Sequence, residues 1–406
     1  MFLSELIPLS EALAIVKENQ KIMETEIITL EDSYLRVLAK EIYSLHDSPS
    51  FDKSAMDGYA VKAENTFGTS SNVVKNLKII DQIGAGDFST KELGEGEAIK
   101  IATGAPIPDG ANAVLMEEYT VADGEDLEIH SQVTPSENVA FRGEDLKKGD
   151  EVVGSSTIIR PQEMGLIASA GFNEVEVYKK PRVKLIITGN ELVEPSPKLD
   201  KAQTINSNKY TISAMIKSAG ADVEIAHGRD DFDEVKEAIH GGATNYDIII
   251  TTGGTAISKG DVVVDVVDGI GEVLIHGVAL RPGKPVGFGI VGGTPVFMLS
   301  GYPVAAMGQF DALVRQYLFK MQNIDYAPKI EKRIATLKIF SNLGRTDYVR
   351  TFSDDKNTKY VLNRGSGIIR SMVEANSYVI IDENQEGVAK SDVVDVLFFD
   401  NMNWNR

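Results

Sequence analysis

Between residues 179 and 325, short apolar runs alternate with stretches whose apolar residues recur every three or four positions. The apolar runs have the length of strands: 182–188, 221–228, 247–252, 272–278, 285–291 and 295–300. The amphipathic stretches have the length of helices: 206–220, with an Asn or Ser cap, 232–242 and the segment from Pro303 onward. This β–α–β rhythm predicts a parallel sheet covered by helices. Ligands of such sheets gather beyond the carboxyl ends of the strands.

The flanking segments follow other patterns. Residues 10–19 and 30–41 are amphipathic and predict helices, the first of them capped by Ser10. Residues 51–139 contain short β-like runs broken by Gly and Pro, which predict a small β domain. Residues 329–406 return to short strands and predict a second β domain. The predicted fold class is therefore multi-domain α/β plus β.

Composition excludes several classes of function. A chain of 406 residues is long for one core, so about two to four domains are expected. Lys and Arg total 41 against 60 Asp and Glu, and the net charge of −19 argues against a nucleic-acid partner. An anionic ligand then needs a local basic group. The absence of cysteine excludes disulfides and thiolate metal sites, and the five histidines include no pair at metal-ligand spacing.

The expected cellular location of the protein follows from the targeting signals that the sequence lacks. The first residues show neither a basic stretch nor an apolar core of a signal peptide. No apolar run approaches the ~20 residues needed to cross a bilayer. We expect a cytoplasmic protein with no membrane partner.

The loop TTGGTAISKGD (251–261) follows an apolar run of the buried type. Small residues such as Thr252, Gly253 and Gly254 let the backbone approach a ligand closely, and hydroxyl groups can donate to its oxygens. Asp261 then opens an apolar run and can cap a helix there. The loop matches neither the GxxxxGK[ST] nor the GxGxxG pattern. A connection without a ligand stays open as the alternative.

Two further strand ends carry carboxylates. TGNEL (188–192) places Glu191 at the predicted edge, and RDDFDE (229–234) adds Asp230 and Asp231. Carboxylates that converge from several strand ends suit Mg²⁺, which prefers oxygen ligands and substrate phosphates. One of the two Asp residues is expected to cap the following helix instead.

Basic groups occur in ALRPGKPVGFG (279–289), where a Pro-Gly turn holds Arg281 and Lys284. Arginine binds oxyanions with two parallel hydrogen bonds, so this turn is a candidate anion site, although a solvated turn is an equal alternative. SGYPVAA (300–306) places Pro303 at the first position of a helix, which leaves a free helix N-terminus for an oxyanion.

Other polar clusters lie outside the central segment. FDKSAMDGYAV (51–61) contains Asp57, and IATGAPIPDGANAVLMEE (101–118) contains Thr103; composition alone favours ordinary turns there. Near the end of the chain, basic and hydroxyl side chains cluster at Arg345, Arg350, Arg364, Ser366, Arg370 and Ser371. Surface charge explains that cluster as well as a site does.

Taken together, these segments resemble one family along the whole chain, the MoeA-type molybdopterin molybdenumtransferases, and are similar also to the C-terminal part of gephyrin. The motifs that carry the resemblance are FDKSAMDGYAV, TGAPIPDGAN, RGEDLKKGD (142–150), PRVKLIITGNELV, the RPGKP turn, LSGYPVAA, GR…R and GSG…S…AN. Their common order along the chain makes the resemblance specific.

The resemblance implies four domains. They are an elongated mixed domain of residues 1–50 and 140–178, a small β domain of 51–139, an α/β molybdopterin-binding domain of 179–325 and a β-barrel-like domain of 328–406. It also implies a homodimer in which the β domain of one subunit meets the α/β and last domains of the other.

The family reaction consumes adenylyl-molybdopterin. With Mg²⁺ the bond to AMP is cleaved, and molybdate, or the chemically similar tungstate, is inserted into the dithiolene to form molybdenum cofactor.

The resemblance also assigns roles to individual residues. It implies catalytic roles for Asp57, Thr103, Asp145, Glu191 and Asp261. It implies substrate or oxyanion binding by Arg142, Thr252, Gly253, Gly254, Arg281, Lys284, Pro303, Arg350 and Ser371. It implies Mg²⁺ binding by Glu191, Asp261 and Asp230 or Asp231.

Some positions depart from the family pattern. Asn190, Ser300 and Tyr302 stand where Asp, Pro and Asn are common, and TTGGT is nearer the loop of the adenylyltransferases that make molybdopterin adenylate. An adenylyltransferase is therefore one alternative, although enzymes of that type need only the α/β domain. A scaffold protein, as in gephyrin, is the other.

Overall fold

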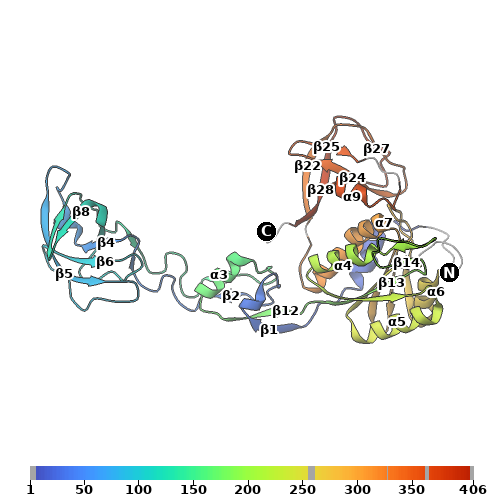
Figure 1. The fold of residues 1–406 in the computed structure, drawn as a ribbon, viewed down its shortest axis with the longest axis horizontal. Coiled ribbons are helices and arrows are strands. Elements are labelled where there is room, and N and C mark those ends of the chain that lie inside the picture. The colour runs from blue at the N-terminus through green and yellow to red at the C-terminus, as the bar shows by residue number, and fades with distance from the viewer. Residues whose placement is uncertain (1–5, 255–260, 327, 362–364, 403–406) are drawn as a thin grey trace.

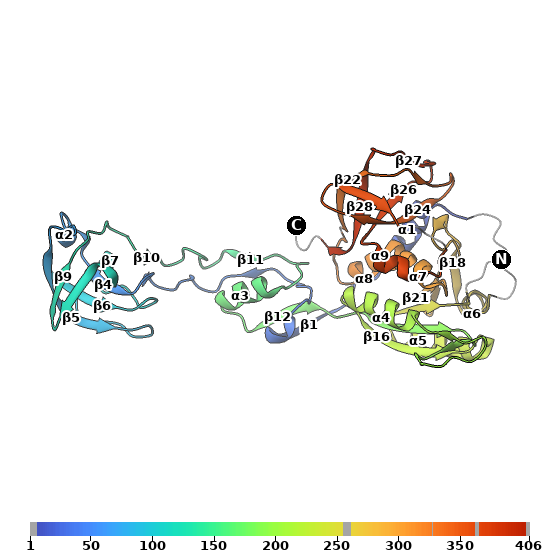
Figure 2. The same cartoon turned by 45° about the horizontal axis from the view of Figure 1, so that its top comes forward.

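The computed structural model describes residues 6–254, 261–326, 328–361 and 365–402. Residues 255–260 of the predicted loop 251–261, and Arg364, lie outside these ranges. The chain is extended: residues 51–139 form a domain at one end of a narrow arm, and an α/β body with a second β domain on top of it lies at the other end (Figures 1 and 2). In the described residues, no helix is long and apolar enough to span a bilayer.

The α/β body is built on one six-stranded sheet. Its strands, in spatial order, are β16 (Asp222–Gly228), β13 (Arg182–Thr188), β17 (Ile248–Thr252), β21 (Thr294–Leu299), β20 (Gly287–Val291) and β18 (Glu272–His276). Successive side chains of a strand point to opposite faces, so β13 sends Leu185 and Ile187 into one core and Ile186 into the other.

Helices cover both faces of this sheet. The face that carries Leu185 packs against α4 (Asn208–Ser218), α7 (Pro303–Gln309), a π-helical turn η3 (Phe310–Val314) and α8 (Arg315–Met321). The opposite face packs against α5 (Phe232–Asn245) and α6 (Val262–Ile270). The predicted alternation of strands and helices is confirmed.

The sequence predicted a parallel sheet, but the observed sheet is only partly parallel. Strands β16, β13, β17 and β21 run parallel, but β20 runs antiparallel to both of its neighbours. Only Gly292 and Gly293 separate β20 from β21, with φ angles of 57° and 83°. A parallel connection needs a crossover of a dozen or more residues, so this two-residue turn must form a hairpin.

The arm consists of segments from both sides of the first β domain. It contains the pairs β1 (Thr25–Thr29) with β12 (Glu174–Tyr178), β2 (Ile42–Tyr43) with β11 (Glu151–Val153) and β3 (Lys53–Ser54) with β10 (Val139–Ala140), as well as α3 (Pro161–Ser169). The predicted helix over 30–41 is wrong. Only the short η1 (Glu31–Ser33) forms there, because Val37 and Leu38 are buried in bridges to Ile158 and Val177.

The first helix differs from the prediction in its place. Helix α1 (Leu9–Glu18) forms as expected, but Leu9, Ala12 and Val16 pack into the core of the α/β body instead of the arm. Pro8, not Ser10, precedes its first turn, and no side chain caps it. The apolar side of this helix packs against another domain, and periodicity alone does not reveal which domain a helix packs against.

The inserted β domain has one sheet of six short strands. In spatial order they are β7 (Ala113–Met116), β4 (Gly58–Val61), β6 (Glu97–Ile101), β5 (Lys75–Ile83), β9 (Asp126–Ile129) and β8 (Thr120–Asp123). A short helix, α2 (Ala63–Thr66), follows β4. The predicted small β domain is confirmed.

The last domain closes its sheet on itself. Its strands are β22 (Pro328–Ala335), β24 (Thr346–Ser353), β25 (Asn357–Tyr360), β26 (Ser377–Ile381) and β28 (Val393–Met402), with a separate pair β23 (Ile339–Phe340) and β27 (Gly387–Val388). Because β24 pairs with both β25 and β26, the strands form a barrel-like ring. Strand β19 (Leu280–Arg281), which belongs to the α/β segment of the chain, joins this ring beside β24.

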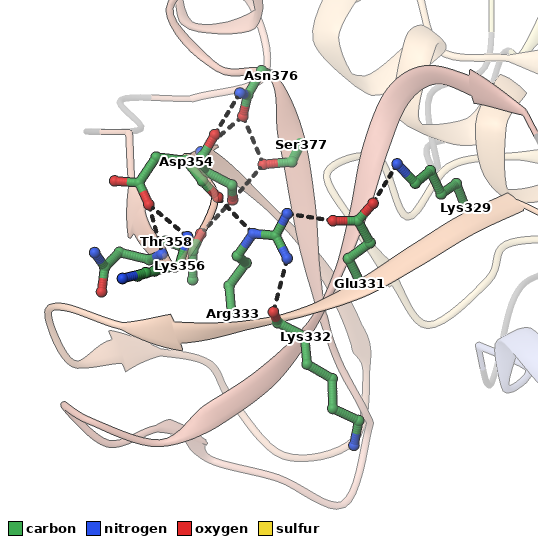
Figure 3. A network of polar contacts seen from close by, with 11 residues as sticks. Lys329, Glu331, Lys332, Arg333, Asp354, Lys356, Thr358, Asn376 and Ser377 are labelled. Carbon is green, nitrogen blue, oxygen red and sulfur yellow. Dashed lines mark hydrogen bonds and ion pairs between the residues drawn. The ribbon is translucent and has the colours of Figure 1, made fainter.

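Polar contacts fix β24 within the ring (Figure 3). Arg333 of β22 donates from Nε to the backbone oxygen of Asp354 at 2.5 Å, and Glu331 pairs with the same guanidinium. The hydroxyl of Ser353 bonds to those of Thr358 and Ser377 at 2.8 and 2.9 Å. These contacts hold the strand on which Arg350 lies.

Candidate functional site

A cavity of about 600 Å³ lies where β13, β17 and β21 end. It is called the strand-end cavity here. The predicted site residues that line it are Glu191, Asp230, Thr252, Gly253, Gly254 and Pro303. Gly367 and Ile369 of the last domain complete its wall, so two domains build it. Tyr302, one of the departures from the family pattern, also lines it and is 64% exposed.

Glycine is required at the loop after β17. Gly253 has a φ of 95°, and a Cβ there would lie 2.5 Å from the backbone oxygen of Thr188. At Gly254 a Cβ would lie 2.7 Å from Cγ2 of Val263. The loop therefore folds back on the end of β13 only without side chains. Packing against Thr188 and Val263 thus accounts for the two glycines, and approach to a ligand, which the sequence predicted for this loop, stays a prediction.

Several buried polar atoms around the cavity lack a hydrogen-bond partner within the described residues. Among them are the hydroxyl oxygens of Thr188 and Thr252, side chains that are 3% and 1% exposed. A buried polar atom without a partner costs about 1–3 kcal/mol. Such atoms beside a cavity point to a ligand that supplies the missing partners.

Two asparagines that the sequence analysis did not select belong to the same group. Asn206 accepts from Lys209 N–H through Oδ1 at 3.1 Å, which leaves its Nδ2 unpartnered. Asn208 donates from Nδ2 to the oxygen of Gly301 at 2.9 Å, which leaves its Oδ1 unpartnered. Both line the cavity. The run NSN at the start of a helix was interpreted only as a capping pattern.

Asp261 is 4% exposed and caps α6, as predicted: its Oδ1 accepts from Val264 N–H at 3.4 Å. Its Oδ2 has no partner in the part of the chain that the structure describes. Burial, with a smaller contribution from the nearby carboxylate of Asp265, raises the pKa of Asp261 to about 7.

The structure distinguishes the two Asp residues after β16. Asp231 caps α5, where its Oδ1 accepts from Asp233 N–H at 3.0 Å and Glu234 N–H at 3.1 Å. Asp230 lines the strand-end cavity and is exposed there. The expectation that one of them acts as a helix cap is confirmed, and Asp230 is the one left to face a ligand.

The carboxylates do not form a ready-made metal cage. Among residues 6–254, 261–326, 328–361 and 365–402, no three Asp, Glu or His side chains gather closely enough to hold a metal ion. Asp230 and Glu191 instead lie exposed in the wall of the cavity. Any Mg²⁺ here would need oxygen ligands from the substrate as well.

A second cavity, of about 380 Å³, lies between the turn 281–285 and the last domain. It is called the arginine cavity here, because Arg281 and Arg350 both line it. Arg350 is 3% exposed and donates from Nη1 to the hydroxyl of Ser371 at 2.5 Å, so this predicted pair lies together. Burial lowers the pKa of Arg350, and the charge of Arg281 adds to that effect.

A buried carboxylate orients Arg281. Asp347, which is fully buried, lies 3.4 Å from Nη1 of Arg281 and also accepts from Nε of Arg345 at 2.9 Å. Parallel pairing of β19 with β24 sets Arg281 opposite Asp347. The cavity thus contains two arginines whose positions the last domain fixes.

The prediction of a free helix N-terminus at Pro303 needs correction, and the predicted role of Lys284 stays a prediction. The helix N-terminus at Pro303 is not free: Val304 N–H donates to the backbone oxygen of Ser366 at 3.0 Å. The last domain, which the sequence pattern did not place there, takes this group. Lys284 is exposed and lines neither of the two cavities.

The other predicted residues lie in the arm and in the inserted domain. Thr103 donates to Asp57 from its N–H at 2.7 Å and its hydroxyl at 3.0 Å, and these bonds lower the pKa of Asp57. Both line a separate cavity with Glu117 and Glu118. This domain lies at the far end of the arm from β13 and β17 (Figure 1), so one chain does not bring Asp57 to the strand-end cavity.

Arg142 and Asp145 lie on the arm, next to the inserted domain. Arg142 donates from Nε to Asp47 at 2.5 Å, and its backbone N–H donates to Asp52 at 2.8 Å. Asp145 is tied to the same region by its N–H, which donates to the oxygen of Ser48 at 3.0 Å. These residues also lie apart from the strand-end cavity within one chain.

Comparison with known proteins places the whole chain. Residues 7–171 match the MoeA N-terminal region (domain I and II), residues 184–320 a probable molybdopterin binding domain, and residues 332–399 the MoeA C-terminal region (domain IV). A putative molybdopterin biosynthesis protein of Methanocaldococcus jannaschii is 38% identical over 389 residues, covering 93% of this chain and 92% of that protein. The chain belongs to the MoeA family.

Other MoeA relatives agree over the same length. A molybdopterin molybdenumtransferase of Staphylococcus aureus is 30% identical over 410 residues, covering 96% of this chain and 95% of that protein. The crystal structure of the molybdopterin biosynthesis moeA protein from Pyrococcus horikoshii is 31% identical and superposes with a TM-score of 0.82, covering 97% of this chain and 100% of that one.

The MoeA regions map onto the two cavities. The strand-end cavity takes most of its lining from the probable molybdopterin binding domain. The arginine cavity takes Arg281 from that domain and Arg350 from the MoeA C-terminal region. The N-terminal MoeA region contains Asp57, Thr103, Arg142 and Asp145.

Proposed function

We propose that this chain is a molybdopterin molybdenumtransferase, which inserts molybdate or tungstate into adenylyl-molybdopterin and releases AMP with the help of Mg²⁺. The observation that carries the proposal is the pair of cavities built around the segments 281–285 and 300–303. The strand-end cavity offers a loop without side chains at Gly253 and Gly254 and polar atoms that have no partner among the described residues. The arginine cavity offers Arg281 and Arg350. The names of the relatives from Staphylococcus aureus and Pyrococcus horikoshii support this function.

In this proposal the strand-end cavity binds adenylyl-molybdopterin. The loop at Gly253 and Gly254 lets backbone approach the phosphate groups, and the hydroxyls of Thr188 and Thr252, which have no partner among the described residues, donate to their oxygens. The unpartnered amide ends beside the cavity suit the ring edge of a pterin, which carries both donors and acceptors.

Mg²⁺ fits the donor set at this cavity. Glu191 and Asp230, which line the cavity, would be its oxygen donors. Asp261, whose Oδ2 has no partner in the described chain, is the third proposed ligand, although it does not line the cavity and the three carboxylates do not form a cluster. When bound, the ion would neutralise charge on the phosphate oxygens as the bond to AMP breaks. The low count of protein carboxylates suits an ion that keeps water and substrate oxygens among its ligands.

The arginine cavity would receive molybdate as substrate. Arg281 and Arg350 can each donate to its oxygens, and the hydroxyl of Ser371 holds Arg350 in place. Lys284 would add charge from its exposed position. Burial makes the contact of Arg350 stronger than it would be in water, because few waters compete for its guanidinium, whereas Arg281 and Lys284 are exposed.

A homodimer completes the proposed site. Asp57 and Thr103 lie at the far end of the arm, so only the inserted domain of a second copy could bring them to a strand-end cavity. Large apolar side chains are exposed along the arm and its junction with the inserted domain: Tyr34, Leu35, Tyr43, Leu45, Phe51 and Phe141. A series of exposed apolar side chains supports a contact surface for the second copy.

The direct test incubates the protein with adenylyl-molybdopterin, molybdate and Mg²⁺, and measures AMP and molybdenum cofactor. Asp57→Ala and Asp261→Asn should abolish both products while circular dichroism stays unchanged. Normal turnover in both variants would refute the assigned carboxylates.

The adenylyltransferase remains the second candidate because of the loop TTGGT. Molybdopterin, ATP and Mg²⁺ without molybdate distinguish the two: accumulation of molybdopterin adenylate favours the adenylyltransferase. Coverage of all three MoeA regions favours the molybdenumtransferase, since an adenylyltransferase of this kind uses the α/β domain alone.

A further inference from the structure

A buried glutamine ties together the backbone of both cavities. Gln309, the last residue of α7, is 0% exposed. Its Oε1 accepts from Ser300 N–H at 2.8 Å, and its Nε2 donates to the backbone oxygens of Gly283 at 2.7 Å and Pro285 at 3.1 Å. One amide therefore connects the turn 281–285 to the loop 300–303.

The two connected segments serve different cavities. Arg281, Pro282 and Gly283 line the arginine cavity. Pro285 and the loop 300–303 line the strand-end cavity. Gln309 itself lines neither, so it contacts no ligand directly. A shift of either segment must strain or break a bond to the same side chain.

The contact is close and chemically selective. Gly283 has a φ of 89°, and a Cβ there would lie 2.5 Å from Nε2 of Gln309 and 2.8 Å from Cβ of Ala305. The position also needs a donor toward two carbonyls and an acceptor toward one N–H. Only an amide supplies both at this size, because a carboxylate has no donor and an apolar side chain has neither.

We propose that Gln309 is a positioning residue that couples the two cavities. An oxyanion held by Arg281 fixes the turn 281–285, and Gln309 passes that restraint to the loop 300–303. Nucleotide then binds to a loop that is already ordered, so each ligand strengthens the binding of the other. The proposal rests on the proposed function, because it takes the two cavities as the oxyanion and nucleotide sites.

Calorimetry with two simple probes tests the coupling. Molybdate is titrated into the full-length protein with Mg²⁺, once without AMP and once with saturating AMP. We expect AMP to tighten molybdate binding by about fivefold or more, the lower end of known coupling between sites. In Gln309→Met each ligand should still bind alone, but the ratio of the two molybdate affinities should fall to near one.

Gln322 provides a matched control. It is 2% exposed, and its Nε2 donates to the backbone oxygens of Ala219 at 3.0 Å and Leu318 at 3.1 Å, away from both cavities. Gln322→Met should lower the melting temperature and keep the coupling. If Gln309→Met does not fold, Gln309→Glu keeps the side-chain volume and the acceptor for Ser300 but loses both donated bonds, and should lose the coupling too.

The outcomes separate this inference from the proposed function. Equal coupling in wild type, Gln309→Met and Gln309→Glu overturns the positioning role, as does independent binding of the two probes to wild type. Loss of coupling in Gln322→Met to the same extent also overturns it. Wild type that binds neither molybdate nor AMP would instead refute the proposed function.

Discussion

At the residue scale, Asp261 is a helix cap whose pKa is nevertheless raised, although hydrogen bonds to a carboxylate normally lower its pKa. It caps α6 through one oxygen, and burial raises its pKa to about 7 while the other oxygen has no partner in the described chain. A carboxyl group with this pKa holds a proton below neutral pH. A cation that binds there must first displace that proton.

The affinity for Mg²⁺ should therefore depend on pH. We expect it to weaken as the pH falls below about 7, because the raised pKa leaves Asp261 protonated there, and to level off above that value. AMP release is measured against Mg²⁺ concentration at a series of pH values from about 5.5 to 8.5, which gives the Mg²⁺ affinity at each pH. The series covers most of the range of about 5–8 in which such groups change charge. Asp268→Asn, an exposed carboxylate on the same helix, should leave the profile unchanged. A flat profile in wild type would contradict the prediction.

Arg350 shows that function and stability make opposite demands. Burial lowers the pKa of its guanidinium, and the like charge of Arg281 adds to that effect. Arg350→Met should weaken tungstate binding by at least tenfold, since hydrogen bonds to charged groups contribute about 1.5–3 kcal/mol each. The same change should keep or raise the melting temperature, because a buried charge without a carboxylate partner disfavours folding.

Arg370→Met is the control for that experiment. Arg370 lies on α9 (Arg370–Glu374) beside Ser371, is 85% exposed and, within the part of the chain that the structure describes, pairs only with Glu374. It should change neither tungstate affinity nor melting temperature. Tungstate affinity that survives in Arg350→Met would show that the anion binds elsewhere.

At the element scale, the hairpin at Gly292 and Gly293 sets the direction of β20. Both residues have positive φ, and a Cβ at either position would meet no atom within 4 Å. An alanine there suffers only the cost of the backbone conformation, about 1–2 kcal/mol. We expect Gly293→Ala to lower the free energy of unfolding by that amount in urea titrations.

Gly241 makes the sign of that effect testable. It lies inside α5 with equally open space around it. Gly241→Ala should raise the free energy of unfolding by about 0.5–1 kcal/mol, because alanine loses less conformational freedom in a helix. A fall in both variants would mean that side-chain contacts, not backbone conformation, decide these positions.

The elements show how far the sequence could lead. Strands such as 182–188 were predictable because buried parallel strands are nearly continuous apolar runs. The helix predicted over 30–41 failed because Leu38 pairs with Val177, which lies far along the chain, and a local pattern does not reveal such a contact. The VGGT hairpin was visible in the sequence but was not interpreted as one.

The candidate site was only partly predictable for a similar reason. Small residues and carboxylates after apolar runs indicated the strand-end cavity, because parallel strands end at one edge. The roles of Arg350 and Ser371 came from the family resemblance, and their contact was not predicted, since neither periodicity nor spacing joins them. Asn206, Asn208 and Gln309 were missed because amides in or just before helices have no characteristic pattern, and only packing reveals their partners.

At the scale of the whole molecule, the proposed dimer makes a strict prediction. Asp57→Ala removes a proposed site residue of the inserted domain, and Arg350→Met removes one of the last domain, at the other end of the arm. Each variant alone should be inactive. If a site takes its two halves from different copies, a mixed dimer contains one site in which both halves are intact.

Co-expression of the two variants tests that arrangement. Random pairing should restore about a quarter of the wild-type sites, because half of the dimers are mixed and each has one intact site of two. AMP release from the co-purified proteins measures it. Activity no higher than that of the single variants would mean that each site is built within one chain.

The way the inserted domain joins the arm has a further consequence. Lys53 and Ala140 are partners in an antiparallel pair, so the chain enters and leaves residues 51–139 at neighbouring points. Such a domain behaves as an exchangeable cassette. We expect that a relative's version of residues 51–139 can replace it without disturbing the register of the arm, because both connections lie at one pair of strands.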